Sequence, residues 1–255
     1  MRKELLYNPY MLLERIGQWA AETRRLRRLS RTSARILNRY HIDSLELLDL
    51  LAKNPPKVVY DIGANRGTWT LLAKTLFPEC EIHAFEPLEI LQEDFIKTTA
   101  GLGNVYWHGV ALGSTRKTSV MNVNSAVDTS SLFPLSGEGR KQWNVSEAGK
   151  TSVQVWPLDV WRQTAQVPWP NLIKLDTQGY ELECLQGAVE CLGRKPAILC
   201  EVSFKTFYEN QPRFSNLVSF LGEKGYELAG LGQGTPLGVE LGQADALFLP
   251  YKKTE

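Results

Sequence analysis

A strand, a glycine turn and a helix in immediate succession constrain the fold of this chain more than any other feature. Residues 58–60 form a short run of β-branched and aromatic residues, the pattern of a strand buried on both faces. Asp61 ends the run, and Gly63 and Gly67 bracket a tight turn. Apolar residues then recur at helical spacing until Pro78 stops the pattern. This order is typical of a nucleotide-binding α/β unit, in which the backbone of the turn approaches a ligand at a helix N-terminus.

The residues within the turn narrow the class of ligand. A dinucleotide site uses the pattern G-x-G-x-x-G, whose closely spaced glycines admit a pyrophosphate. Here Asp61 precedes the first glycine, and Asn65 stands where the middle glycine would be. An acidic side chain at this point repels a diphosphate and suits a cationic amino group, such as that of S-adenosylmethionine (SAM). An ordinary βα turn without a ligand is the alternative, because a short motif is only a hypothesis.

A second strand is predicted over residues 81–85, and Glu86 and Pro87 follow it. Glu86 lies 25 residues after Asp61, close to the spacing of about 20 residues at which an acidic side chain of the second strand reaches ribose hydroxyls. Pro87 stops the strand and so places Glu86 at its carboxyl end. Taken alone, Glu86 also fits a solvated loop, but its spacing from the glycine turn favours a ligand contact.

Two further acidic residues are predicted at strand ends in the second half of the chain. Residues 172–175 have the pattern of a buried strand that ends at Asp176, and the chain then turns into a single helix that Gly193 closes. Glu201 follows another apolar strand at residues 197–200. Ligands of open parallel sheets bind outside the carboxyl ends of the strands, so we expect all four acidic residues at one edge. Their mutual repulsion without a ligand indicates a binding site there.

A long insertion is predicted between these two halves. A third strand at residues 104–108 is followed by a turn at residues 109–113, near the expected position of an adenine. Strand-like segments around residues 119–123 and 152–158 then flank a polar loop, so that residues 114–157 approximately form the insertion. An insertion of this length at the working edge of an α/β sheet is a natural lid or substrate-binding element, and a surface excursion is the alternative.

Several segments combine into one pattern. Its most specific part is the block Ile-Lys-x-Asp-x-x-Gly-x-Glu at residues 173–181, which Leu-x-Gly-Ala follows at residues 185–188. Further matching segments are Asp61–Gly67, Phe85–Pro87, Leu158–Asp159 and Glu201. This combination resembles the FkbM family of SAM-dependent methyltransferases, and the resemblance covers roughly residues 57–250. One departure is Gln178, where the family often has Glu, and this change removes one candidate base.

The resemblance implies the Rossmann-like α/β fold of class I methyltransferases, with a seven-stranded, mostly parallel sheet and helices on both faces. The last strand is then antiparallel, and residues 226–231 and 244–249 fit the closing hairpin. The methyltransferase domain is expected at residues 57–255, after an N-terminal helical arm at residues 1–56. SAM is the implied cofactor and S-adenosylhomocysteine (SAH) its product. The implied reaction is O-methylation of a hydroxyl, or occasionally a carboxyl, on a sugar, lipid, polyketide or other small metabolite.

Site roles follow from the resemblance and from the strand-end positions. Methyl transfer requires that the acceptor oxygen align with the methyl group and lose its proton. Asp176 is the first candidate for the base or acceptor-orienting group, and Glu201 is the second. Lys174 lies on the same face of a regular strand, where it pairs with Asp176 or stabilises an alkoxide. A helix-capping role is the alternative for these carboxylates. In the cofactor site, Gly63, Ala64, Asn65 and Gly67 are expected to contact the amino-acid tail, and Asp61 to hold that region through its charge or through loop hydrogen bonds. Glu86, with Pro87 beside it, is expected at the ribose, and Val110 and Ala111 at the adenine.

The first 40 residues are strongly basic, with ten Lys or Arg against three Glu. Their arginines are interleaved with apolar residues, which predicts one or two amphipathic helices. Three roles stay open: a helical cap with a solvated basic face, a surface for anionic lipid headgroups, and a wall that attracts an acidic substrate. The chain has no apolar run of 18 residues, and its start lacks the pattern of a secretory signal. The clustered arginines are Arg24, Arg25, Arg27, Arg28, Arg31, Arg35 and Arg39.

Composition excludes several other sites. The four cysteines contain no C-x-x-C pair and lack a partnering histidine cluster, which favours reduced thiols and a cytoplasmic protein. Oxygen ligands at Asp159, Asp176 and Glu201 suit a hard cation, but no ligand loop accompanies them, so no metal is expected.

Two other function classes stay open: a nucleic-acid methyltransferase that uses the basic arm, and a non-catalytic Rossmann-like binding protein. The expected partner is a small-molecule, glycan or lipid hydroxyl rather than nucleic acid. Tryptophans that either stack on an acceptor ring or fill the core are Trp107, Trp143, Trp156, Trp161 and Trp169.

Overall fold

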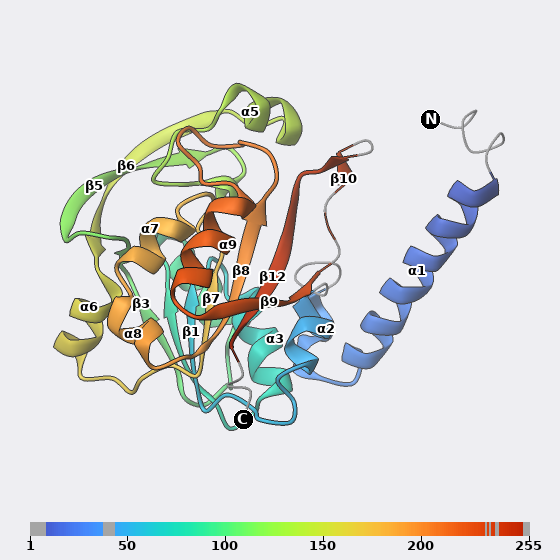
Figure 1. The fold of residues 1–255 in the computed structure, drawn as a ribbon, viewed down its shortest axis with the longest axis horizontal. Coiled ribbons are helices and arrows are strands. Elements are labelled where there is room, and N and C mark those ends of the chain that lie inside the picture. Colours follow the sequence, from blue (N-terminus) through green and yellow to red (C-terminus); the bar gives the residue numbers. More distant parts are fainter. Residues whose placement is uncertain (1–8, 38–43, 233, 235, 238–239, 252–255) are drawn as a thin grey trace.

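A seven-stranded sheet runs through the centre of the computed structural model, which describes residues 9–37, 44–232, 234, 236–237 and 240–251 (Figure 1). Its strands lie in the order β3-β2-β1-β7-β8-β12-β9. Neighbours from β3 to β8 are parallel, and β12 is antiparallel to both β8 and β9. This arrangement confirms the predicted fold class, including its antiparallel closing hairpin. The strands are β1 (Val58–Ile62), β2 (Glu81–Phe85), β3 (Val105–His108), β7 (Leu172–Leu175), β8 (Ala197–Ser203), β9 (Tyr226–Leu231) and β12 (Gln243–Pro250).

The order of the strands reverses between β1 and β7. These two strands lie side by side in parallel register, with Tyr60 opposite Ile173 and Asp61 opposite Lys174. The chain proceeds from β1 to β2 and β3 on one side, and from β7 to β8 on the other. Ligands of open α/β sheets bind outside the carboxyl ends of the strands at such a switch point. The first strand is also longer than predicted, because it continues through Asp61 to Ile62.

Helices cover both faces of the sheet and bury two apolar cores, whose large side chains each contribute about 1.5–3 kcal/mol. The first core contains Leu48 and Trp69, and the second contains Leu185 and Leu221. On the first face lie α2 (Ser44–Asp49) and α3 (Thr68–Leu76), with α4 (Gln92–Thr98) beside α3. On the second face lie α6 (Leu158–Ala165), α7 (Glu181–Gln186), α8 (Val189–Gly193) and α9 (Phe214–Glu223). Short elements elsewhere are the 3-10 helices Ser33–Leu37, Glu89–Leu91 and Val127–Thr129, and the hairpin of β10 (Pro236–Leu237) and β11 (Glu240–Leu241).

The predicted insertion forms a second, three-stranded sheet in the order β4-β6-β5. It is joined to the body by side-chain hydrogen bonds to backbone carbonyls: Ser131 Oγ donates to Gln178 at 2.7 Å, and Ser136 Oγ donates to Thr206 at 2.8 Å. The strand expected over residues 152–158 begins earlier and ends at Trp156. Its last predicted residue starts α6 instead, because Pro157 fixes the backbone at the boundary. The elements are β4 (Ala111–Leu112), β5 (Lys117–Asn124), α5 (Gly137–Trp143) and β6 (Glu147–Trp156).

The helix predicted after β7 is in fact two short helices, α7 and α8. At the break, Gly187 packs against backbone, since a Cβ there would lie 2.0 Å from the carbonyl oxygen of Gly113. The carboxylate of Asp159, from α6, then accepts hydrogen bonds from the backbone N–H groups of Glu190 at 2.7 Å and Cys191 at 3.0 Å. Asp159 therefore satisfies the first turn of α8, which explains one of the motif residues without any ligand.

The basic N-terminal arm contains one long helix, α1 (Pro9–Leu29), which projects from the body in Figure 1. The C-terminal part of α1 is anchored by ion pairs with α2: Arg25 Nε lies 2.5 Å from Glu46, and Arg28 donates two hydrogen bonds to Asp49. Arg39 of the predicted arginine cluster lies outside the described residues. No helix in the described part of the chain is long and apolar enough to cross a membrane.

We expect Asp159→Ala to lower the free energy of unfolding by about 1 kcal/mol, the usual cost of losing an N-terminal cap. Urea denaturation measures this change. Glu190→Gln is the matched control, because its exposed side chain should alter stability by less than about 0.5 kcal/mol. Equal stability of Asp159→Ala and the parent protein would contradict the capping role.

Candidate active site

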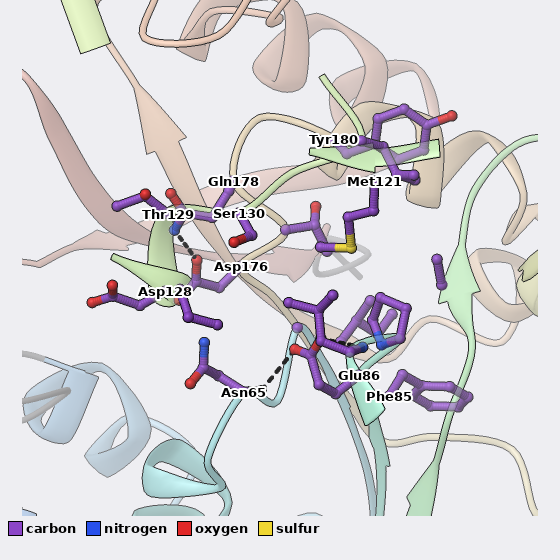
Figure 2. A pocket seen from close by; sticks show the side chains of 18 of the residues that line it. Asn65, Phe85, Glu86, Met121, Asp128, Thr129, Ser130, Asp176, Gln178 and Tyr180 are labelled. Carbon is purple, nitrogen blue, oxygen red and sulfur yellow. Dashed lines mark hydrogen bonds between the residues drawn. The ribbon is translucent and has the colours of Figure 1, made fainter. Parts of the chain in front are cut away.

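A cavity of about 600 Å³ opens at the carboxyl edge of the sheet, beside the switch point between β1 and β7. This volume lies within the range of about 300–1,000 Å³ that is usual for small-molecule sites. Three parts of the chain that are distant in sequence form its wall. As Figure 2 shows, Asn65 and Glu86 come from the loops after β1 and β2, Asp176 and Gln178 from the loop after β7, and Asp128, Thr129 and Ser130 from the insertion.

The glycine turn packs directly against the loop after β7. Gly63 has a φ of +80°, and a Cβ there would lie 1.9 Å from the carbonyl oxygen of Asp176, so the position requires glycine. The backbone N–H groups of Gly63 and Ala64 both donate to the carbonyl oxygen of Phe85, at 2.9 and 3.0 Å. These contacts hold the ends of β1, β2 and β7 together at one side of the cavity.

Glu86 is fixed at the end of β2 by two backbone donors. Its Oε2 accepts from the N–H of Asn65 at 3.1 Å, and its Oε1 accepts from the N–H of Leu88 at 2.9 Å. The residue is only 5% exposed, yet it lines the cavity. Burial raises the pKa of Glu86 to about 7, against the lowering effect of the two backbone donors. Glu86 is therefore a preoriented acceptor for hydroxyl donors, and its charge changes near neutral pH.

Lys174 lies between two carboxylates in the interior. Its Nζ is 3.3 Å from Asp61 and 3.5 Å from Asp176, and it donates to the carbonyl oxygen of Gly63 at 3.1 Å. Asp61 is fully buried and also accepts from Thr70 Oγ1 at 2.6 Å. Burial lowers the pKa of Lys174, but attraction to Asp61, Asp176 and Asp245 outweighs burial, and the net pKa is raised. The ammonium group is thus held charged behind the cavity wall.

The side of the cavity beyond Asp176 carries a chain of hydrogen bonds. Gln178 Nε2 donates to Asp176 Oδ1 at 2.8 Å and to Glu201 Oε2 at 3.4 Å. The hydroxyl of Tyr208 contacts Gln178 Oε1 at 2.7 Å, and Gln243 Nε2 donates to Glu201 Oε2 at 2.9 Å. Burial raises the pKa of Glu201 well above its ordinary value, and neighbouring carboxylates raise it further. Sequence analysis recognised Gln178 only as a departure from a family pattern, and it missed Gln243 entirely.

The insertion supplies the remaining wall of the cavity. Trp143 on α5 is the predicted tryptophan that reaches the cavity, and it packs against Phe207 with ring centroids 4.9 Å apart. Trp161 is a core residue, and the rings of Trp156 and Trp169 lie 3.6 Å from the guanidinium carbons of Arg116 and Arg162 respectively. The insertion, predicted as a lid or substrate-binding element, therefore contributes directly to the cavity. The lining residues of the insertion are Met121, Val127, Asp128, Thr129, Ser130, Leu132 and Trp143.

The sequence-predicted site residues fall into two groups. Most line the cavity: Gly63, Asn65, Glu86, Pro87, Val110, Ala111, Asp176 and Glu201. The remainder lie behind its wall: Asp61, Ala64, Gly67 and Lys174. The structure therefore brings all four predicted strand-end carboxylates to one edge, but it separates the two buried partners Asp61 and Lys174 from direct ligand contact.

Metal ligation finds no support in the described part of the chain, which contains no cluster of three His, Cys, Asp or Glu residues that could hold an ion. The carboxylate of Asp159 accepts from the backbone of α8 instead.

SAM fits the residues that are present. Glu86 lies where a carboxylate for the ribose is expected, and Asn65 stands where a pyrophosphate site would have its middle glycine. The lining combines polar groups with apolar side chains such as Leu88, Val110 and Leu132.

Comparisons with known proteins agree with these features. The model of the methyltransferase FkbM domain matches residues 61–228. The hexuronic acid methyltransferase AglP of Haloferax volcanii is 25% identical over 145 residues, which cover 57% of this chain and 55% of that protein. The chain therefore spans about half the length of this curated relative.

Two solved structures are similar to this chain. The methyltransferase FkbM of Methylobacillus flagellatus KT is 14% identical with a TM-score of 0.49, and the match covers 92% of this chain and 60% of that one. The magnesium protoporphyrin IX methyltransferase ChlM of Synechocystis PCC 6803 is 10% identical with a TM-score of 0.46, and the match covers 82% of this chain and 81% of that one.

We expect the affinity for SAH to rise as the pH rises through about 7, the pKa of Glu86. The ionised carboxylate accepts hydrogen bonds from ribose hydroxyls, whereas the protonated form loses part of that capacity. Calorimetric titration at several pH values measures the effect. Glu86→Gln should bind SAH at least about tenfold more weakly and with little pH dependence, because a hydrogen bond to a charged group contributes about 1.5–3 kcal/mol. If the affinity of Glu86→Gln for SAH changed with pH as it does in the parent protein, the assignment of Glu86 to the ribose hydroxyls would be wrong.

Proposed function

Because this chain belongs to the FkbM family of methyltransferase domains, we propose that it catalyses the SAM-dependent O-methylation of a sugar hydroxyl. The observation that carries the proposal is a single cavity with two sides. Glu86 and the glycine turn lie on one side, and Asp176, Gln178 and Glu201 lie on the other. The first side suits a nucleoside with an amino-acid tail, and the second offers carboxylates to a hydroxyl acceptor.

The cofactor side is proposed to hold SAM through backbone and carboxylate contacts. Gly63 and Asn65 approach the amino-acid tail, Glu86 accepts from the ribose hydroxyls, and Val110 and Ala111 flank the adenine. When bound, SAM supplies a methyl group activated by a sulfonium, and SAH is the product. Asp61 and Lys174 support this side from behind, because Lys174 donates to the carbonyl oxygen of Gly63.

Asp176 is proposed to take the proton of the acceptor hydroxyl. It stands at the carboxyl end of β7, lines the cavity and lies 3.5 Å from the Lys174 ammonium, which favours its ionised form. A positioned general base of this kind contributes about 10²–10⁴-fold to a rate. Gln178 orients the carboxylate by donating to Oδ1, and the Lys174 ammonium lies 3.5 Å from Oδ2.

A sugar is the acceptor class that we favour. The curated relative AglP is a hexuronic acid methyltransferase, and the acceptor side here combines an indole with several hydrogen-bonding groups. Rings such as that of Trp143 suit the apolar face of a pyranose, while Asp128, Thr129 and Ser130 offer partners to hydroxyls.

The test is turnover of SAM with a panel of uronic acid and neutral hexose glycosides, read by mass spectrometry as SAH and methylated sugar. Asp176→Asn should lower kcat by about 10²–10⁴-fold, because it removes the base. Its affinity for SAH should change little. Glu93→Gln is the matched control, since this exposed carboxylate pairs with Lys97 and is not among the residues that line the cavity. If Asp176→Asn turned over SAM as fast as the parent protein, Asp176 would not be the base. If the rate of SAH formation were the same with and without each sugar, the acceptor would not be a sugar.

The arm is proposed to contact an anionic lipid surface at the periphery of a membrane. Trp19 is 64% exposed and Ile16 is 51% exposed on α1. Trp19, Thr23 and Arg27 follow one another at intervals of four residues and therefore share one side of the helix. Residues 9–37 carry seven Arg against two Glu, so the excess charge complements an anionic headgroup layer. Exposed tryptophan beside arginine is also the composition that favours a membrane interface.

Vesicle sedimentation tests this contact. The protein should bind vesicles that contain phosphatidylglycerol and not vesicles of phosphatidylcholine alone. Arg24→Gln and Arg27→Gln should each weaken binding by about fivefold, since one basic residue near the surface contributes about 1 kcal/mol. Lys97→Gln is the matched control on an exposed helix of the body. Equal binding to both kinds of vesicle, or arm variants that bind as well as the control, would contradict the proposal. A concentration-dependent increase in molecular mass without vesicle binding would instead assign α1 to a second copy of this chain.

A further inference from the structure

Two carboxylates of the cavity share one amide. Gln178 Nε2 lies 2.8 Å from Asp176 Oδ1 and 3.4 Å from Glu201 Oε2, so both acidic groups lie against the same nitrogen. Both also line the cavity. Two carboxylates this close cannot both be charged without a large repulsion unless cations accompany them. The surroundings of each group therefore decide which one carries the charge.

A third residue, Tyr208, lies against the amide oxygen. Its hydroxyl is 2.7 Å from Gln178 Oε1 and 2.8 Å from the carbonyl oxygen of Thr129, so its single proton is shared between two acceptors. The amide nitrogen faces Asp176 and Glu201. Gln243 Nε2 adds a second donor to Glu201 Oε2 at 2.9 Å, so that both amide donors converge on this one oxygen of Glu201. Its other oxygen, Oε1, receives neither amide donor and is the atom left to carry a proton.

The charged neighbours of the two carboxylates differ. The Lys174 ammonium is 3.5 Å from Asp176 and 3.3 Å from Asp61. Glu201, on β8, is surrounded mainly by other acidic groups. Asp245 stands opposite it on β12, and Asp176 and Glu181 belong to the loop and helix after β7. The attraction of Lys174 to Glu201 is outweighed by burial and by these three carboxylates.

We propose that Asp176 is ionised and that Glu201 is a neutral carboxylic acid, which donates a hydrogen bond to the acceptor and leaves the role of base to Asp176. This inference rests on the proposed methyl transfer. In the step, the acceptor oxygen forms a bond to the methyl carbon and the carbon–sulfur bond breaks with its electron pair on sulfur. The hydroxyl proton passes to Asp176, and Glu201 keeps its own proton throughout. Glu201, the second candidate base in the sequence, therefore does not act as a base in this step.

The neutral form of Glu201 has a consequence for the acceptor. A protonated carboxyl donates to an oxygen acceptor, such as a ring oxygen, an ether or a carbonyl, whereas a carboxylate repels these lone pairs. Glu201 thus selects a sugar that presents an oxygen beside the reacting hydroxyl. Gln178 and Gln243 are positioning residues in this account, because they act on the acceptor only through the two carboxyl groups.

Sinefungin is the probe that tests the two protonation states without knowledge of the acceptor. This SAM analogue carries a cationic amine where SAM carries its methyl group. Its affinity therefore depends on whether Asp176 is charged. The parent protein should bind sinefungin about tenfold or more tightly than SAH, equivalent to about 1.4 kcal/mol. Asp176→Asn should abolish this preference. Glu201→Gln should preserve it within about twofold, because an amide replaces a group that is already neutral.

The affinity of each variant for SAH is the control for folding and for the cofactor side. A parent protein that fails to bind SAH would refute the proposed function itself. An equal loss of preference in Glu201→Gln and Asp176→Asn would show two charged carboxylates and overturn this inference alone. A second measurement keeps the proposal testable if a variant does not fold. At neutral pH the infrared carbonyl band of protonated carboxyls should be weaker in Glu201→Gln than in the parent protein, because Glu86 contributes to the band in both proteins. This comparison does not need Asp176→Asn, and equal bands would overturn the proposal.

Discussion

A buried ammonium between two carboxylates holds the site together. Lys174, 4% exposed, joins the interior Asp61 to the cavity residue Asp176, and it also donates to the carbonyl oxygen of Gly63. Removing one partner of such a buried pair is costly, because an uncompensated charge stays in a medium of low polarity. The glycine turn of β1 and the strand end of β7 are therefore fixed relative to each other. Both sides of the cavity depend on this connection.

Much of this edge could be predicted from short-range patterns. Apolar runs that end in Asp61, Glu86, Asp176 and Glu201 placed four carboxylates at one edge of a parallel sheet, and the structure places them there. Such runs are informative because strands buried on both faces are continuously apolar, and because ligands bind where they end. The family pattern added the number of strands in the sheet and the closing hairpin. Local periodicity did not reveal the helix break at Gly187, since a contact with the distant Gly113 causes it.

Long-range partners account for the residues that sequence reasoning missed or misplaced. Gln243 reaches Glu201 from β12, and Tyr208 contacts Gln178 from a loop after β8. Neither pairing leaves a signal in spacing along the chain. Asp61 was expected to hold the tail region through its charge or through loop hydrogen bonds, and its carboxylate accepts from Thr70 and lies 3.3 Å from the Lys174 ammonium. The insertion was recognised by its length and polarity, whereas the part of it that faces the cavity depends on how β5 and β6 fold back over the sheet.

The charges of the lining bear on the nature of the acceptor. Glu86, Asp128, Asp176 and Glu201 line the cavity, and Arg66, which pairs with Asp94 at 3.1 Å, lies at the same wall. A neutral Glu201 reduces the negative field that an acidic sugar such as a uronic acid would meet. The same protonation state thus accommodates an anionic acceptor and reserves proton transfer for Asp176.

In the proposed complex, one cavity holds SAM with its reacting centre toward Asp176. A crystal structure of the protein with SAH is the decisive measurement. The amino-acid tail should lie at the loop of Gly63 and Asn65, the ribose hydroxyls on Glu86, and the sulfur should face Asp176. A ligand bound elsewhere, or bound here with its sulfur turned away from Asp176, would contradict this placement.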